Sequence, residues 1–235
     1  MAENRSIFQF KQFALAHGNP GLKITTEACL FGAWSAQFPQ QNTLDIGTGC
    51  GLLIGMLSQA HPNAHFTGIE IQPEVAKLAE ENTSSLSNAH IQIHANALEN
   101  YSGKHDFILC NPPFFINHLK NKDASKNQAM HSDTLSPAEL ASGIQRLLSP
   151  EGKFTVLYPP VGMKQFEEAA KEKGLYVNQI CEVKHQASHE TLRLMAQGSF
   201  QEGRKVQEIL IIKNPDESYS DAFIRLLKPY YLIFD

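Results

Sequence analysis

The sequence predicts an α/β, Rossmann-like fold with a doubly wound, mostly parallel sheet of seven strands and helices on both faces. Two observations support this prediction. From about residue 43 onward, short apolar segments alternate with stretches of helical character, which is typical of a parallel sheet covered on both sides. A glycine-rich turn directly follows the first apolar segment, at the strand end where such sheets bind their ligands.

Each predicted element has its own signal in the sequence. The expected strands are residues 43–46, 66–69, 91–94, 107–110, 154–158, 175–183 and 208–212. The expected helices are residues 52–60, 74–86, 136–148 and 163–173. Pro73 fits the first turn of its helix, Ser136 is a predicted N-cap with Pro137 at the first position, and Gly174 ends the last helix.

The remaining segments suggest how the chain is organised. Residues 1–42 precede the sheet and are expected to form an N-terminal extension packed on a domain of residues 43–235. Residues 115–134 and 184–207 are polar and irregular, so both are candidate substrate loops.

The composition is typical of a globular protein. Hydrophobic residues make up 42% and charged residues 19% of 235 residues, which is ordinary for a globular protein with a core. We expect a cytoplasmic protein, because the sequence has no bilayer-spanning run, no signal peptide and only four widely spaced cysteines. The net charge of −4 argues against a protein coated in positive charge, but it permits a local basic face for nucleic acid.

The glycine turn after the first strand points to a nucleoside cofactor other than NAD. Its sequence is D-x-G-x-G-x-G, formed by Asp45, Gly47, Gly49 and Gly51, and no frame places glycine at the sixth position of G-x-G-x-x-G. The turn resembles the first motif of class I methyltransferases, which wraps the methionine part of S-adenosylmethionine. An acidic residue, Glu70, ends the second strand and is placed to accept hydrogen bonds from the ribose hydroxyls.

Two further segments follow strand ends. Asn96 follows the third strand, where class I methyltransferases usually have an aspartate that contacts the adenine amine; an asparagine oxygen can still accept that bond. Asn111-Pro112-Pro113-Phe114 follows the fourth strand and resembles the (D/N)-P-P-(Y/F/W) motif of enzymes that methylate planar amino groups.

The chemistry of a planar amine explains why this motif is needed. Such an amine is a poor nucleophile because its lone pair is delocalised into the ring. The Asn111 side-chain oxygen and the Pro112 carbonyl can each accept one N–H and favour a pyramidal nitrogen. We expect Asn111 to lie against the cofactor as well. Pro113 keeps the turn rigid, and Phe114 offers a face on which a base can stack.

The segments outside these motifs resemble the bacterial tRNA1(Val) (adenine(37)-N6)-methyltransferase family over nearly the full chain. The resemblance is carried by FKQF (10–13), LKITTEACLFGAW (22–34), AMHSD (129–133), PDESYSDAF (215–223) and YYLIF (230–234). It implies methylation of N6 of adenine 37 in tRNA, with S-adenosylmethionine as methyl donor and S-adenosylhomocysteine as product. It also implies that Lys23 and Thr26 lie near the cofactor, although Glu27 replaces the aspartate that follows the threonine in the family.

Other substrates and roles remain open at this stage. The same motifs serve enzymes that methylate guanine N2 in rRNA or glutamine amides in proteins, and a non-catalytic RNA-binding protein on the same scaffold is also possible. We expect a tRNA partner, no membrane, no metal and no obligate protein partner. Candidate phosphate contacts are the basic residues of the two loops, namely Lys120, Lys122, Lys126, Lys184, His185, His189, Arg193, Arg204 and Lys205.

Overall fold

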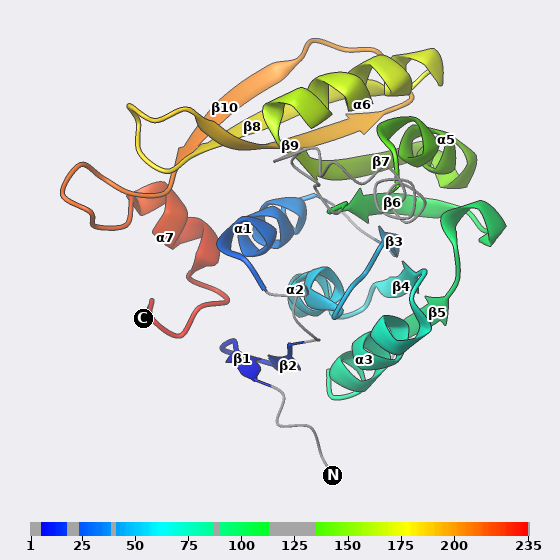
Figure 1. Cartoon of the computed structure of the whole chain (residues 1–235), viewed down its shortest axis with the longest axis horizontal. Helices are drawn as coiled ribbons and strands as arrows, with labels where there is room; N and C mark the ends of the chain where they lie inside the picture. Colours follow the sequence, from blue (N-terminus) through cyan, green and yellow to red (C-terminus); the bar gives the residue numbers. More distant parts are fainter. Residues whose placement is uncertain (1–5, 18–23, 39–40, 87–89, 113–134, 235) are drawn as a thin grey trace, which may run out of the picture.

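The structure is a computed structural model that describes residues 6–17, 24–38, 41–86, 90–112 and 135–234. Its centre is an eight-stranded sheet in the order β10-β8-β9-β7-β6-β3-β4-β5, and Figure 1 shows helices on both sides of it. The strands are β3 (Asn42–Ile46), β4 (His65–Glu70), β5 (Ile91–Ala95), β6 (His105–Cys110), β7 (Leu148–Tyr158), β8 (Tyr176–Lys184), β9 (Thr191–Ser199) and β10 (Val206–Ile211).

The sheet is doubly wound, as the sequence predicts. From β3 the chain moves outward through β4 to β5, and it then returns to β6 on the other side of β3 and continues to β7. All neighbouring strands run parallel except β9, which is antiparallel to both β7 and β8. The switch of direction lies between β3 and β6, and a ligand is expected outside the carboxyl ends of these two strands.

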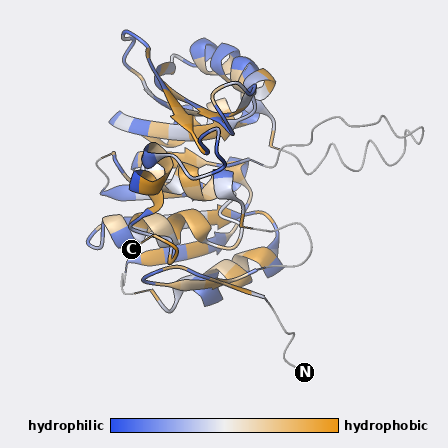
Figure 2. Cartoon of the chain, turned by 90° about the vertical axis from the view of Figure 1, so that its left-hand side faces the viewer, coloured by the Kyte–Doolittle hydropathy of each residue, from blue (hydrophilic) through white to orange (hydrophobic). Residues whose placement is uncertain are grey.

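Two hydrophobic cores cover the two faces of the sheet. One core contains side chains of α1 (Thr26–Ser35), α2 (Leu52–Ala60), α3 (Pro73–Thr83) and α7 (Asp221–Leu227). The other core contains side chains of α5 (Pro137–Leu147) and α6 (Pro160–Glu172). The hydropathy colouring of Figure 2 shows apolar segments between these layers. No helix within the described residues is both long and apolar enough to cross a membrane.

Local signals set the helix ends. Ser136 accepts a hydrogen bond from the Glu139 backbone N–H at 3.2 Å, and the Glu139 carboxylate accepts one in return from the Ser136 backbone N–H at 2.8 Å. This capping box confirms the predicted start of α5 and satisfies two N–H groups that the helix leaves without partners. Helix α6 begins at Pro160, three residues before the predicted start, because proline needs no N–H partner in a first turn.

The prediction that residues 184–207 form an irregular loop was wrong, and so was the count of seven strands. Residues 191–199 form β9, an interior strand between β7 and β8. Leu194 and Ala196 pack toward one core and Met195 toward the other, so the strand lacks a simple alternation of apolar and polar residues. Gly198 also suggests a loop, but a Cβ there would lie 2.3 Å from the Tyr176 carbonyl oxygen, so the site excludes any larger residue.

The N-terminal residues pack on the sheet domain. Strands β1 (Ile7–Gln9) and β2 (Ala14–Ala16) form an antiparallel hairpin, which Figure 1 shows below α2 and beside α3. The Asn82 side chain on α3 binds both backbone groups of Ala16, at 2.9 and 3.1 Å. The rings of Phe10 and Phe13 stack with centroids 4.4 Å apart and belong to the same core as α1 and α2.

Candidate active site

The glycine turn leaves β3 and enters α2 with three glycines in the left-handed region. Their φ angles are 70° at Gly47, 56° at Gly49 and 83° at Gly51, a conformation that side chains with a Cβ disfavour. The backbone N–H groups of Gly47 and Thr48 donate to the Ile69 carbonyl at 2.9 and 3.0 Å, which ties the turn to the end of β4. A Cβ at Gly47 would meet no atom within 4 Å, so this part of the turn borders open space.

Glu70 ends β4 and is only 8% exposed. One of its carboxylate oxygens accepts from the Gly49 backbone N–H at 3.2 Å, and the other accepts from the Gln72 backbone N–H at 3.1 Å. These two bonds hold the carboxylate between the glycine turn and the start of α3. Each carboxylate oxygen can accept a second hydrogen bond, so the group remains able to bind a ligand hydroxyl.

Asp45 lies beneath the turn and is fully buried. Its Oδ2 accepts from the Thr48 hydroxyl at 2.7 Å, whereas its Oδ1 has no hydrogen-bond partner among the residues that the structure describes. Burial raises the pKa of Asp45 to about 7; the charge of Glu70 acts in the same direction, and the Thr48 hydrogen bond opposes it. Burial therefore favours the protonated form of Asp45 more than in an exposed aspartate.

Replacing Asp45 with asparagine is expected to change how stability depends on pH. Because folding raises this pKa from 3.8 to about 7, the stabilising contribution is present at low pH and is lost as the pH rises toward 7. One pKa unit corresponds to about 1.4 kcal/mol. The free energy of unfolding of Asp45→Asn, relative to that of the wild type, should therefore rise by on the order of 2 kcal/mol as the pH increases from about 5 to about 8. Denaturant unfolding across this range measures the difference, and parallel pH profiles would contradict a raised pKa.

The predicted acceptor motif begins where β6 ends. Cys110 is the last residue of β6; Asn111 is half-buried and Pro112 is buried. Burial raises the pKa of the Cys110 thiol well above its usual range, so this neighbour of Asn111 stays protonated and is a poor nucleophile. Pro113 and Phe114 lie outside the described residues.

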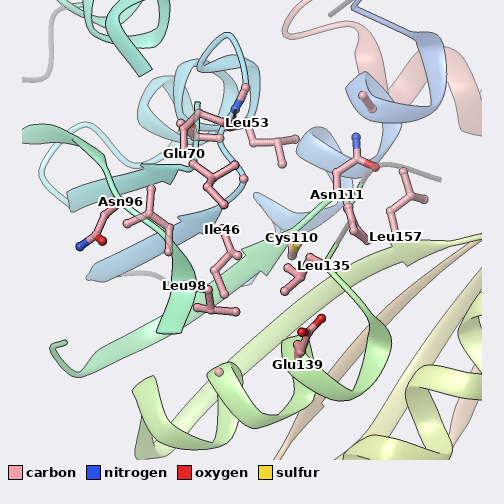
Figure 3. A pocket seen from close by; sticks show the side chains of 18 of the residues that line it. Ile46, Leu53, Glu70, Asn96, Leu98, Cys110, Asn111, Leu135, Glu139 and Leu157 are labelled. Carbon is pink, nitrogen blue, oxygen red and sulfur yellow. Dashed lines mark hydrogen bonds between the residues drawn. The ribbon is translucent and has the colours of Figure 1, made fainter. Parts of the chain in front are cut away.

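One cavity of about 1190 Å³ joins the glycine turn, Glu70 and the acceptor motif. It lies along the carboxyl ends of five adjacent parallel strands, β5, β4, β3, β6 and β7, and reaches Arg193 near the amino end of the antiparallel strand β9. Figure 3 shows Glu70 and Leu53 on one side of this space, Asn111 and Leu157 on another, and Glu139 of α5 opposite them. The cavity brings together the predicted residues Gly47, Gly49, Glu70, Asn96, Asn111 and Pro112.

The other predicted cofactor residues have different positions. Thr26 is exposed at the start of α1 and does not line the cavity, whereas its neighbour Thr25 lines it and caps the helix. Asp45 and Gly51 lie behind the cavity wall, and a Cβ at Gly51 would approach the Thr83 side chain to 3.0 Å. Lys23 lies outside the described residues.

Several cavity residues were missed by the sequence analysis. Ile71 directly follows Glu70, lines the cavity and is 57% exposed, which is unusual for a large apolar side chain. The sequence could have predicted this position for Ile71, because it directly follows the acidic residue at the end of a predicted strand. Leu98, Leu157 and Glu27 carried no comparable signal, because their places in the wall depend on how distant segments pack.

The candidate phosphate contacts separate into two groups. The turn between β8 and β9 contains or adjoins Lys184, His185, His189 and Arg193. This turn lies at the same end of the strands as Asn111. Arg204 and Lys205 lie at the opposite end of the strands, in the connection from β9 to β10. The Lys205 ammonium forms an ion pair with the Glu167 carboxylate at 2.8 Å. Lys120, Lys122 and Lys126 lie outside the described residues.

Metal ligands and disulfides add nothing to this site. All four cysteines are buried and free. In the described part of the chain, no group of three His, Cys, Asp or Glu side chains could hold a metal ion. The rings of His185 and His189 stack with centroids 5.6 Å apart.

Comparisons with solved structures agree on the fold. A predicted O-methyltransferase from Agrobacterium tumefaciens superposes with a TM-score of 0.66, covering 86% of this chain and 95% of its own, at 14% identity. A methyltransferase from Pyrococcus furiosus superposes with a TM-score of 0.57, covering 79% and 88%, at 17% identity. At these identities the likeness shows the fold alone, and it confirms the predicted Rossmann-like fold.

Comparisons of sequence identify the family. A family model described as a methyltransferase domain matches residues 38–214. The tRNA1(Val) (adenine(37)-N6)-methyltransferase of Pseudoalteromonas translucida is 32% identical over 96% of this chain and 98% of its own. Proteins of the same name from Vibrio vulnificus and Bacteroides fragilis are each 34% identical, over 96% and 97% of this chain and 95% and 99% of theirs. The chain therefore belongs to the tRNA1(Val) (adenine(37)-N6)-methyltransferase family, as the sequence motifs predict.

Proposed function

We propose that this protein transfers the methyl group of S-adenosylmethionine to the exocyclic N6 of adenine 37 in tRNA1(Val). The observation that carries this proposal is the shared cavity, in which the glycine turn and Glu70 lie beside Asn111 and Pro112. The names of relatives that match over nearly their full length support the choice of base and of tRNA. S-adenosylhomocysteine would be the product.

The residues at one end of the cavity fit a nucleoside cofactor with an amino-acid tail. Gly47 leaves space where any side chain would enter the cavity, which lets the backbone approach a ligand closely. Glu70 would accept from the ribose hydroxyls, and Asn96, on the far side of the cavity from Asn111 in Figure 3, would accept from the adenine amine. When bound, S-adenosylmethionine supplies an electrophilic methyl group on a positively charged sulfur.

The residues at the end of β6 would act on the amine. The Asn111 side-chain oxygen and the Pro112 carbonyl would each accept one N–H of the target, so that its lone pair is directed toward the methyl group. The half-buried position of Asn111 beside Leu157 and Cys110 lowers competition from water for these bonds. No general base is required, because the nitrogen becomes acidic as it is methylated and its proton can leave to water.

The target adenine would have to leave its stack to reach Asn111, as in other enzymes that modify a base. Phe114 is our candidate for stacking with the extruded base. We also propose that residues 1–42 are an N-terminal extension packed on a catalytic domain of residues 43–235. The reason is that Phe10 and Phe13 of the β1–β2 hairpin belong to the same core as α1 and α2.

Labelled S-adenosylmethionine with purified protein and total tRNA from a strain that lacks this gene tests the proposal. We expect label in N6-methyladenosine, in a valine tRNA, without any added protein. A catalytically impaired variant such as Asn111→Ala serves as the matched control. Label in rRNA or in protein would keep the methyltransferase activity and overturn the tRNA substrate, whereas label in another nucleoside would overturn the choice of adenine N6.

A further inference from the structure

The cavity continues beyond the acceptor motif into a part that the cofactor does not explain. Past Asn111 its wall is formed by Leu157 of β7, Arg193 of β9 and Glu27 of α1. The glycine turn follows β3 and Glu70 ends β4, and both strands lie on the other side of β6. A substrate that reaches Asn111 therefore has the cofactor on one side and the Arg193 side of the cavity on the other.

The sheet register gives the position of Arg193 relative to Asn111. Val156 of β7 pairs with both Cys110 of β6 and Ala196 of β9, so these three residues lie in one row. Arg193 precedes Ala196 by three positions on an antiparallel strand, and it therefore lies farther toward the cavity opening than Asn111. Two strand spacings separate β6 from β9, about 10 Å across the sheet. This separation is comparable with the length of one nucleotide from its base to its phosphate.

Arg193 lines this part of the cavity, and two contacts position its guanidinium. Its Nη1 donates to the Leu192 carbonyl at 2.7 Å, and its Nη2 lies 4.0 Å from Glu27 Oε1. The side chains of Arg193 and Glu27 are 19% and 24% exposed, so the pair is shielded from bulk water but reachable from the cavity. A distance of 4.0 Å is too long for a hydrogen bond, so Glu27 positions the guanidinium through the attraction between opposite charges.

We propose that Arg193, positioned by Glu27, binds a backbone phosphate of the RNA at or next to the target nucleotide. This inference rests on the proposed function, since it assumes a nucleotide with its base at Asn111. A guanidinium is always charged and presents a planar fork of N–H donors that matches phosphate oxygens. A charge-assisted bond of this kind would hold the extruded nucleotide while the base occupies the acceptor site.

The competing assignment for Arg193 is the carboxylate of the cofactor's methionine part, because Glu27 and Thr25 also line the cavity near the start of α1. The position of Arg193 favours the RNA, because β9 is separated from the glycine turn by both β6 and β7. The two assignments predict opposite effects on cofactor affinity and on the KM for tRNA.

The experiment compares the full-length wild type with Arg193→Ala, Arg193→Lys and Arg204→Ala, using labelled S-adenosylmethionine and tRNA from the strain lacking this gene. Arg204→Ala is the matched control, because it removes an arginine from the opposite end of the strands, away from the cavity. For Arg193→Ala we expect the KM for tRNA to rise roughly tenfold or more, with the Kd for S-adenosylmethionine unchanged. The slope of log KM against log salt should become shallower by about 0.7, the value for one phosphate contact on a single strand.

The conservative variant and the salt slope separate binding from a structural role. Arg193→Lys keeps the charge without the planar fork, so it should restore most of the salt slope and part of the KM. An unchanged KM and salt slope in Arg193→Ala, with methylation by the wild type intact, would overturn this inference alone. A weaker cofactor affinity with unchanged KM for tRNA would assign Arg193 to the cofactor instead. Failure of the wild type to methylate any tRNA would contradict the proposed function and this inference together.

Discussion

Asn111→Ala is expected to lower kcat about 10²- to 10³-fold, the size of effect seen when one preorganised polar group is removed from an active site. The reason is that alanine removes the side-chain oxygen that would accept an N–H of the target amine. The Kd for S-adenosylmethionine should stay within a few-fold of the wild-type value. The residues that we propose bind the cofactor, the glycine turn and Glu70, line the other end of the cavity and are unchanged in this variant. Single-turnover transfer and calorimetric titration measure the two quantities separately.

Two further substitutions sharpen this test. Asn111→Asp keeps an acceptor oxygen and should retain far more transfer than Asn111→Ala, in line with the aspartate that the related motif allows. Asn111→Leu keeps the volume and removes the oxygen, so it should resemble alanine. If Asn111→Ala folded normally but lost cofactor affinity, the division of the cavity into a cofactor end and an acceptor end would be wrong.

Glu70→Ala is expected to weaken S-adenosylmethionine binding about 10²- to 10³-fold, because the two charge-assisted hydrogen bonds that we propose between Glu70 and the ribose hydroxyls would be lost. The carboxylate also accepts from the backbone N–H groups of Gly49 and Gln72, so its removal leaves both donors without this partner and loosens the turn. At saturating cofactor, kcat should fall much less than in Asn111→Ala. Titration of the variant with S-adenosylmethionine and with S-adenosylhomocysteine measures the loss.

A matched control is available four residues further along the chain. Glu74→Ala removes an exposed carboxylate from the first turn of α3, outside the cavity, and should leave the affinity unchanged. Glu70→Gln should bind the cofactor weakly as well, because its NH₂ group would face either the Gly49 or the Gln72 N–H donor. An affinity equal to the wild type in Glu70→Ala would remove the ribose role from Glu70.

Most of the elements around the cofactor end could be predicted from the sequence because their signals are local. A glycine turn needs residues that tolerate positive φ, and Gly47, Gly49 and Gly51 all adopt it. The cap of α5 depends on Ser136 and Glu139 alone, and the structure has the capping box. These signals act within a few residues, so reading them requires no knowledge of the rest of the fold.

The rest of the site was decided by tertiary structure. Strand β9 was missed because an interior strand is stabilised by neighbours on both sides, and Arg193, Gln197 and Gly198 give it a polar, loop-like sequence. The same placement brings Arg193 to Glu27, although 166 residues separate them in the chain. The pKa of Asp45 also depends on tertiary structure, because burial by distant segments causes most of its rise.

The sequence by itself therefore determined the fold class, the family motifs and the residues that follow the strand ends, since each of these is written in short segments. Only the tertiary structure decided that the motifs share one cavity with Arg193 and Glu27, and that Asp45 lies behind its wall. The physical reason is that burial, desolvation and strand order are sums over contacts between residues far apart in the chain, which local patterns do not encode.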